Sequence, residues 1–222
     1  MKLIHSLHRW IYPPKCVLCG KLLEKDETDL CPHCRIHAPD CPVLRDKYPY
    51  LRRWVALWYY DDEVRRSLLR YKFFRKRGHA EAYGRLLGKK LMAADLMDFD
   101  ILTYVPISPK RRRQRGFDQG QLLAQKVGRQ IGKKPQRVLK KWRDNPAQSG
   151  IFGQAERRAN VLGVYRVIDP QLVAGKKILL LDDIVTTGAT ASECARVLLT
   201  AGAQEVDLAV VAAARQHKKV SR

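Results

Sequence analysis

A chain of 222 residues with 45% hydrophobic residues is long enough for one ordinary domain and a small appendage, and wholesale disorder is excluded. Its apolar runs are shorter than the ~20 residues that cross a bilayer, and residues 1–16 carry His, Arg and Trp where a signal peptide needs a continuous apolar core, so we expect a cytoplasmic protein without membrane insertion. The 43 Lys and Arg outnumber 22 Asp and Glu, and the net charge of +21 favours polyanionic partners such as nucleic acid or phosphorylated small molecules; a basic surface without a dedicated partner is the alternative.

Two Cys-x-x-Cys pairs lie near the N-terminus, eleven residues apart: Cys16 and Cys19, then Cys31 and Cys34. Four thiolates at such spacing are typical of a tetrahedral Zn²⁺ with no open coordination position, so we expect a structural zinc. Free or redox-active thiols are the alternative, and His33 and Cys41 are the substitutes if one ligand is wrong. We therefore divide the chain into a four-cysteine zinc-binding module over residues 1–45 and an α/β domain over residues 46–222.

From residue 54 onwards, predicted strands and helices alternate. Aromatic and β-branched residues predict a strand over 54–60, and Asp61 or Asp62 can cap a helix whose apolar residues follow at helical spacing. The remaining predicted elements are a helix over 80–96, a strand over 100–106, a basic loop, a helix over 118–131, strands over 163–168 and 177–181, a helix over 189–200 and a strand over 205–213. This order predicts an α/β fold, a mainly parallel sheet flanked by helices. In the last helix, Cys194 is expected to be a buried apolar residue rather than a nucleophile.

The most informative segment begins with the apolar residues 178–181, which predict a strand buried on both faces. Asp182 and Asp183 follow at its carboxyl end, where parallel α/β sheets bind their ligands. Thr186–Thr190 then turns into a helix, and Gly188 lets backbone N–H groups approach a phosphate closely. Two acids would repel a lone phosphate, but a ribose phosphate suits both features, because its hydroxyls donate to the carboxylates, which also help to place Mg²⁺. A strand-to-helix turn with a capping acid and no ligand is the alternative.

This segment resembles the phosphoribosyl-pyrophosphate motif of type I phosphoribosyltransferases, in which two acids precede Thr-Thr-Gly-x-Thr. The matching positions are Asp182, Asp183, Thr186, Thr187, Gly188 and Thr190. The resemblance implies that the acids hold the ribose hydroxyls of phosphoribosyl pyrophosphate. It also implies that the loop, Ala189 included, holds the 5-phosphate.

Further segments extend the resemblance over almost the whole chain, to the ComF family of phosphoribosyltransferase-like proteins linked to DNA uptake in competence. The matches, besides the cysteine module, are Tyr71-Lys72-Phe73, Val105-Pro106, Arg111–Phe117, Gln148 and Arg158-Ala-Asn160-Val161. Asp118 departs from the family, which usually has Asn there, although Asp can still cap the following helix. The family resemblance implies a type I phosphoribosyltransferase-like fold that binds phosphoribosyl pyrophosphate with Mg²⁺.

The basic run Lys110–Gly116 places five cations in six residues before a glycine. The resemblance implies a mobile loop that closes over pyrophosphate, and Arg115, next to the hinge, is the cation that we expect to act in catalysis with the two acids. Tyr71 and Lys72 are expected to line the pyrophosphate site. A solvated charge run is the alternative for the basic run.

The segment Arg65–Arg77 interleaves seven cations with Tyr71, Phe73 and Phe74. This mixture suits single-stranded nucleic acid, where bases stack and phosphates pair, and a core-facing aromatic pair under a basic surface is the alternative. Three functions therefore stay open. The chain could transfer the phosphoribosyl group to an unidentified acceptor, although no dedicated general base is visible. It could instead be an accessory protein for single-stranded DNA, acting with DNA-uptake proteins, or a regulator that senses phosphoribosyl pyrophosphate.

Overall fold

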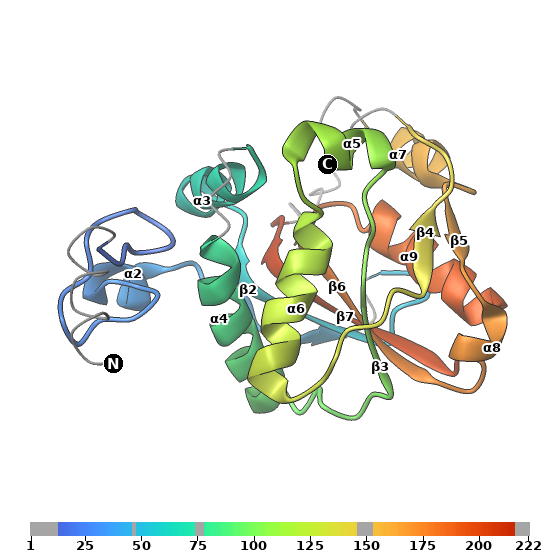
Figure 1. Ribbon diagram of the computed structural model, residues 1–222, viewed down its shortest axis with the longest axis horizontal. Coiled ribbons are helices and arrows are strands. Elements are labelled where there is room, and N and C mark those ends of the chain that lie inside the picture. Colours follow the sequence, from blue (N-terminus) through green and yellow to red (C-terminus); the bar gives the residue numbers. More distant parts are fainter. Residues whose placement is uncertain (1–12, 46–47, 74–77, 146–152, 216–222) are drawn as a thin grey trace, which may run out of the picture.

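The structure is a computed structural model that describes residues 13–45, 48–73, 78–145 and 153–215 (Figure 1). The helices are α2 (Pro32–His37), α3 (Asp62–Phe73), α4 (His79–Ala93), α5 (Pro109–Arg115), α6 (Gln119–Ile131), α7 (Gln154–Val161), α8 (Pro170–Val173) and α9 (Ala189–Thr200). The strands are β1 (Leu44–Arg45), β2 (Arg53–Tyr59), β3 (Ile101–Tyr104), β4 (Leu139–Lys141), β5 (Tyr165–Val167), β6 (Lys177–Val185) and β7 (Glu205–Ala213). Within the described ranges, no helix is long and apolar enough to span a bilayer.

A five-stranded sheet forms the centre of the fold, in the order β1-β2-β7-β6-β3. The last four of these are parallel, and β1 is antiparallel to β2. Helices α4 and α6 cover one face of the sheet and α9 covers the other. Side chains of β6 pack into both cores: Leu179 and Leu181 lie in the core under α4 and α6, whereas Ile178 and Leu180 lie in the core under α9. This alternation follows from the two-residue period of a strand. The predicted α/β fold with a mainly parallel sheet is confirmed.

The basic segment that was predicted to be a loop is helix α5 instead. Pro109 occupies its first turn, and the Ser108 side chain accepts a hydrogen bond from Arg111 N at 3.3 Å, which satisfies one of the free donors of the helix start. Gly116, at φ +76°, ends the helix in the left-handed conformation. Apolar periodicity failed to predict this helix because a run of cations has none, whereas the residues at its two ends carried the signal.

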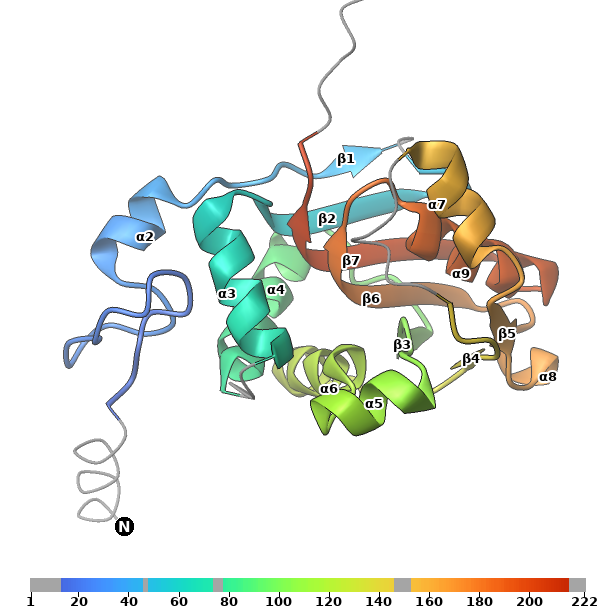
Figure 2. The same cartoon turned by 90° about the horizontal axis from the view of Figure 1, so that it is seen from above.

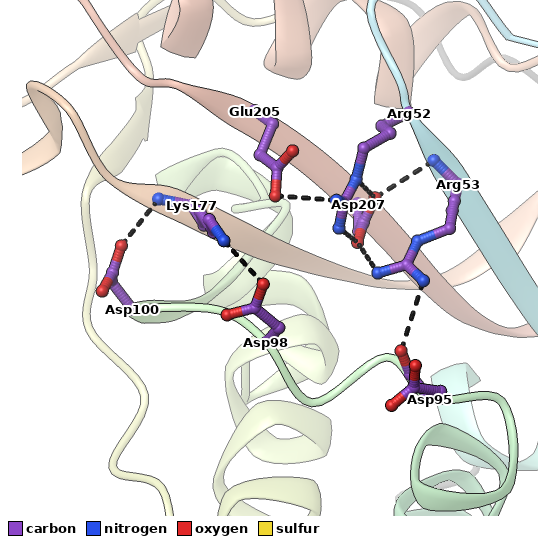
Figure 3. A network of polar contacts seen from close by, with 8 residues as sticks. All are labelled: Arg52, Arg53, Asp95, Asp98, Asp100, Lys177, Glu205 and Asp207. Carbon is purple, nitrogen blue, oxygen red and sulfur yellow. Dashed lines mark hydrogen bonds and ion pairs between the residues drawn. The ribbon is translucent and has the colours of Figure 1, made fainter.

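The amino ends of the parallel strands are joined by a network of charged residues (Figure 3). Its members are Arg52, Arg53, Asp95, Asp98, Asp100, Lys177, Glu205 and Asp207. Asp207 is 6% exposed and accepts hydrogen bonds from Arg52 Nε (3.0 Å) and Arg53 N (3.1 Å), which ties β7 to the start of β2. Lys177 N donates to Asp100 at 2.8 Å and so ties β6 to the segment before β3. This network lies at the end of the sheet opposite to the predicted ligand site.

Candidate functional site

The two predicted acids lie at the carboxyl end of β6, where the strand leaves the core. Asp183 is buried, and its Oδ1 is 3.0 Å from Lys72 Nζ of α3. Its Oδ2 is also buried and has no hydrogen-bond partner in the part of the chain that the structure describes. Asp182 Oδ1 accepts a hydrogen bond from Asp183 N at 2.8 Å, and burial, together with the neighbouring Asp183 charge, raises the pKa of Asp182 well above its ordinary value. A positive charge placed here would relieve this repulsion.

The loop after β6 has a conformation that only glycine accepts at its last position. Gly188 has φ +80°, and a Cβ added there would collide with the ring of Tyr48, so both the backbone angle and the packing require glycine. Thr187 Oγ1 accepts a hydrogen bond from Ala189 N at 3.4 Å, at the first residue of α9. The loop therefore ends at a helix N-terminus that faces the same end of the sheet as the acids, which is a suitable place for an anion.

Cations from three helices reach this end of the sheet. Lys72 of α3 pairs with Asp183. Arg115, the last residue of α5, lies over the ring of Phe73 with its Cζ 5.0 Å from the centroid; burial lowers the pKa of Arg115, and attraction by Asp183 opposes that shift. Arg157 Nη1 of α7 donates to Thr186 Oγ1 at 3.2 Å. Sequence reasoning missed Arg157, because nothing in the pattern of the basic segments distinguishes it from its neighbours.

Tyr71 and Lys72 have different surroundings, although they are adjacent in α3. Tyr71 is fully buried, its hydroxyl donates to the carbonyl oxygen of Gln119 at 2.7 Å, and its ring packs edge-on against Tyr83. Of the pair that was predicted to line the pyrophosphate site, Lys72 is therefore the residue whose charged group reaches the acids. Tyr71 belongs to the core that supports α3.

Asp118 occupies the N-cap of α6, as predicted. Its two carboxylate oxygens accept from separate backbone donors, Gln121 N at 3.1 Å and Ile107 N at 3.2 Å. An Asn would have only one acceptor oxygen for these two donors, so the carboxylate suits this position well. Burial raises the pKa of Asp118, and the backbone hydrogen bonds oppose that shift.

A cavity of about 240 Å³ lies between α5, α6 and β4, next to the N-cap Asp118. Arg112, Arg137 and Lys141 line it, so its wall is strongly basic. Burial, followed by repulsion from Arg111, lowers the pKa of Lys141 to about 8. The cavity therefore brings Arg112 of α5 together with two cations from a later segment of the chain.

Three further residues named from the sequence are less informative. Gln148 lies outside the described residues. Arg158 is exposed, and the carbonyl oxygen of Asn160 accepts from Asn145 Nδ2 at 2.8 Å, so this part of α7 serves local structure. Cys194 is fully buried, which confirms the prediction of a packing residue.

The cysteine module gathers its four predicted ligands: the sulfurs of Cys16, Cys19, Cys31 and Cys34 all lie within 4.8 Å of one another. The Sγ atoms of Cys19 and Cys31 are 3.7 Å apart. A tetrahedral zinc with Zn–S bonds of about 2.3 Å places neighbouring sulfurs about 3.8 Å apart, so the observed spacing fits zinc. The sheet site and this cluster lie on either side of α3 (Figure 2).

Comparisons with known proteins agree with this architecture. The phosphoribosyl transferase domain family matches residues 118–222. The DNA utilization protein YhgH of Escherichia coli O157:H7 is 30% identical over 203 residues, which cover 87% of each chain. The competence protein ComFC of Streptococcus pneumoniae R6 is 28% identical over an alignment that covers 86% of this chain and 96% of that one.

The chain belongs to the ComF family. The similarity to its ComF relatives includes the N-terminal part of the chain, which the phosphoribosyl transferase domain match leaves out. Among solved structures, the allosteric regulatory enzyme of purine biosynthesis is 23% identical with a TM-score of 0.44, covering 64% of this chain and 29% of that chain.

Proposed function

We propose that the carboxyl end of β6 binds phosphoribosyl pyrophosphate together with Mg²⁺. One observation carries the proposal: Asp183 is buried, one of its oxygens is paired with Lys72, and the other has no hydrogen-bond partner among the described residues. A buried carboxylate oxygen without a partner costs free energy, and a ligand hydroxyl or a metal ion would remove that cost. The relatives are named for DNA utilization and competence, and the match of residues 118–222 to the phosphoribosyl transferase domain family supports a ligand of this kind.

The assignment of ligand groups follows from charge. The 5-phosphate suits the loop Thr186–Thr190, where backbone N–H groups at the start of α9 and the Arg157 guanidinium are close. The ribose hydroxyls suit the acceptor oxygens of Asp182 and Asp183. The same two carboxylates are the hard oxygen ligands that Mg²⁺ prefers, and the ion would neutralise charge on the pyrophosphate when bound.

The pyrophosphate suits the cations beside the acids, Lys72 and Arg115. In a transfer reaction, a nucleophile forms a bond to C1 of the ribose while the C1–O bond to pyrophosphate breaks, and the electron pair leaves with pyrophosphate. The two cations would stabilise the negative charge that develops on the leaving group. Among the residues that sequence reasoning proposed as catalytic, Asp182 and Asp183 orient the ribose in this scheme, and Arg115 stabilises the leaving group.

Calorimetric titration with phosphoribosyl pyrophosphate and Mg²⁺ tests the proposal. We expect binding by wild type and its loss in the double variant Asp182→Asn, Asp183→Asn. The variant Asp98→Asn, which removes one exposed carboxylate at the opposite end of the sheet, is expected to bind like wild type. Arg115→Ala should weaken phosphoribosyl pyrophosphate more than ribose 5-phosphate. No binding by well-folded, zinc-loaded wild type would contradict the proposed function.

A second function, binding of single-stranded DNA, is favoured by one specific observation. Phe73 is 58% exposed and lies beside Arg115, so an aromatic face and a cation are available together on a chain of net charge +21. Tyr71, by contrast, is buried and offers no face for a base. Counterion release predicts a steep fall in oligonucleotide affinity with salt, and Phe73→Ala should weaken binding. Fluorescence anisotropy that detects no binding at low salt, or equal binding by Phe73→Ala, would rule this surface out.

A further inference from the structure

We propose that the metal-loaded cysteine module holds helix α3 in place and thereby sets the position of Lys72 at the sheet site. Ser67 and Arg70 of α3 act in this scheme as positioning residues. The inference rests in part on the proposed function, because Lys72 matters for a ligand only if the sheet site binds one.

The first step is the contact between the cysteine module and α3. Val17 and Leu18 lie between the first two cysteines, both are buried, and their carbonyl oxygens accept hydrogen bonds from α3. The Ser67 hydroxyl donates to Val17 O, and the Arg70 guanidinium donates to Leu18 O and also reaches Val17 O at 3.4 Å. The segment that the metal would organise is therefore the segment to which α3 is bonded.

The second step is the dependence of these carbonyls on the metal. A short segment between two cysteines has no core of its own, and its folding energy comes largely from metal binding. When the thiolates of Cys16 and Cys19 share an ion, the two residues between them have one conformation, and both carbonyls are presented to α3. Without the ion, buried Ser67 would lose a fixed acceptor, which is costly for a side chain that water does not reach.

The third step is the geometry of α3 itself. Ser67 and Arg70 are three residues apart and share a face of the helix, whereas Lys72 is two residues beyond Arg70 and points to nearly the opposite side. On that side, Lys72 Nζ lies 3.0 Å from Asp183 Oδ1. Figure 2 shows α3 between the module and the rest of the fold. A shift of about 1 Å in this helix would disturb the Lys72 ion pair, and misplacement of this size affects ligand binding strongly.

A buried network on α3 adds a second connection to the site. The Ser67 hydroxyl is 2.6 Å from the Tyr83 hydroxyl, and the Tyr83 ring packs edge-on against Tyr71 with centroids 5.6 Å apart. Tyr71 in turn donates to the carbonyl oxygen of Gln119 at the start of α6. The buried side chains of Ser67, Tyr83 and Tyr71 thus connect the module to the residues beside the site.

A different contact supplies a control. Arg85 of α4 pairs with Asp29 through Nε at 3.0 and 3.1 Å, and this contact anchors the module to a helix without site residues. Arg66 of α3 is exposed and makes no hydrogen bond or ion pair with the described residues of the module, so Arg66→Ala matches Arg70→Ala in charge and helix while leaving those contacts untouched. Arg66→Ala therefore controls for the loss of a positive charge on α3. Arg85→Ala controls for the loss of another contact of the module, the one with α4.

The test combines hydrogen exchange with calorimetry. In ligand-free protein, removal of the metal by a chelator, and separately Arg70→Ala, should each speed amide exchange in α3 at least tenfold, while β6 and β7 keep their protection. Arg66→Ala and Arg85→Ala should leave α3 like wild type. At equal zinc content, Arg70→Ala should bind phosphoribosyl pyrophosphate about tenfold more weakly than Arg66→Ala. If Arg70→Ala does not retain zinc, Ser67→Ala replaces it, since it keeps the Arg70 contacts with the module and removes the bond to Val17 together with the contact with the Tyr83 hydroxyl.

Two outcomes would overturn the inference: α3 exchange that is unchanged after metal removal, or equal ligand affinity in Arg70→Ala and Arg66→Ala. A wild type that binds no ligand, while α3 still responds to metal removal, would count against the proposed function and leave the positioning of α3 standing. Reciprocity gives an independent check. If zinc in the module raises the affinity of the sheet site for its ligand by some factor, the bound ligand must raise the affinity of the module for zinc by the same factor. Chelator competition with and without phosphoribosyl pyrophosphate measures that factor.

Discussion

Adjacent residues at and beside the site have different surroundings. Asp182 remains partly accessible and has a raised pKa, whereas Asp183 is buried beside Lys72. Tyr71 and Lys72 divide in the same way, one inside the core and the other at the acids. In both pairs, the direction in which the helix or strand presents each side chain decides its surroundings.

Gly188→Ala should disrupt the loop that we propose to bind the 5-phosphate. The new methyl group would meet the Tyr48 ring and also place a side chain at φ +80°, so we expect the free energy of unfolding to fall by about 2 to 4 kcal/mol. Gly175→Ala is the matched control: it has φ +69° but open space around it, and only the backbone cost of about 1 kcal/mol is expected. Chemical denaturation measures both, and equal losses would mean that the contact with Tyr48 is unimportant.

Lys141 predicts a pH dependence. Its pKa is lowered from 10.5 to about 8 by burial and then by Arg111, so between these values the folded chain binds fewer protons than the unfolded chain. The contribution of Lys141 to the free energy of unfolding should therefore rise from pH 8 to 10.5 and be lost as the pH falls through 8. Side-chain NMR should find a Lys141 midpoint near 8 that moves upward in Arg111→Ala. A midpoint at the ordinary value would contradict the burial of this amine.

Helix α5 shows how one element changes the interpretation of its residues. In a loop, the positions of the cations of Lys110–Gly116 could not be predicted. Because the segment is a helix that ends at Arg115, the Arg115 guanidinium lies over the ring of Phe73. The other basic side chains of α5 are distributed around the helix, and Arg112 lines the neighbouring cavity. Helical geometry therefore divides one basic run between two surfaces.

The cysteine module should contain one metal ion. Metal analysis of the purified chain should return about one zinc per chain, and Cys34→Ser should release it and lower the temperature of unfolding, because the ion supplies folding energy to the module. Cys194→Ala, at a buried cysteine of α9 outside the cluster, should keep the zinc. A clean preparation that holds neither zinc nor another thiophilic metal would contradict the assignment.

In the molecule as a whole, charged contacts gather at one end of the sheet, and the other end is the one that we propose to bind the ligand. Charged contacts join the amino ends of β2 and β7, and others tie the amino end of β6 to the segment before β3 (Figure 3), while the acids, the proposed phosphate loop and the cations gather at the carboxyl ends. Parallel strands make this separation possible, because all their carboxyl ends lie on one side.

Asp207→Ala tests this division. It removes the buried acceptor of Arg52 and Arg53, so we expect the free energy of unfolding to fall by about 2 to 4 kcal/mol, with no change in ligand affinity. Asp98→Ala removes an exposed partner of Lys177, and its effect on the free energy of unfolding should be much smaller, because solvent screens that pair. Denaturation and calorimetry measure the two effects, and weaker ligand binding by a folded Asp207→Ala would show that the ends are coupled.

Much of this architecture was predictable because it depends on local patterns. Residues 178–181 are apolar enough to require a buried strand, the acids and Gly188 follow at fixed spacing, and the two cysteine pairs are near enough in sequence to share an ion. The α/β class follows from the alternation of elements. Helix α5 was missed because its signal lay in its caps and not in its apolar pattern.

The amino-acid sequence alone was thus enough to establish the fold class, the acids and loop that follow the central strand, and the cysteine cluster. Lys72 and Arg115 were named from the sequence through the family resemblance, but their contacts at the site, and Arg157 itself, could be identified only once the chain was folded. Lys72, Arg115 and Arg157 come from three helices separated by long stretches of chain, and their meeting depends on how each helix packs. The contact of Ser67 and Arg70 with the cysteine module could not be predicted either. Its acceptors are backbone carbonyl oxygens, which every residue has, so the sequence does not indicate which of them accept a hydrogen bond. Long-range packing, and not local propensity, places these groups together.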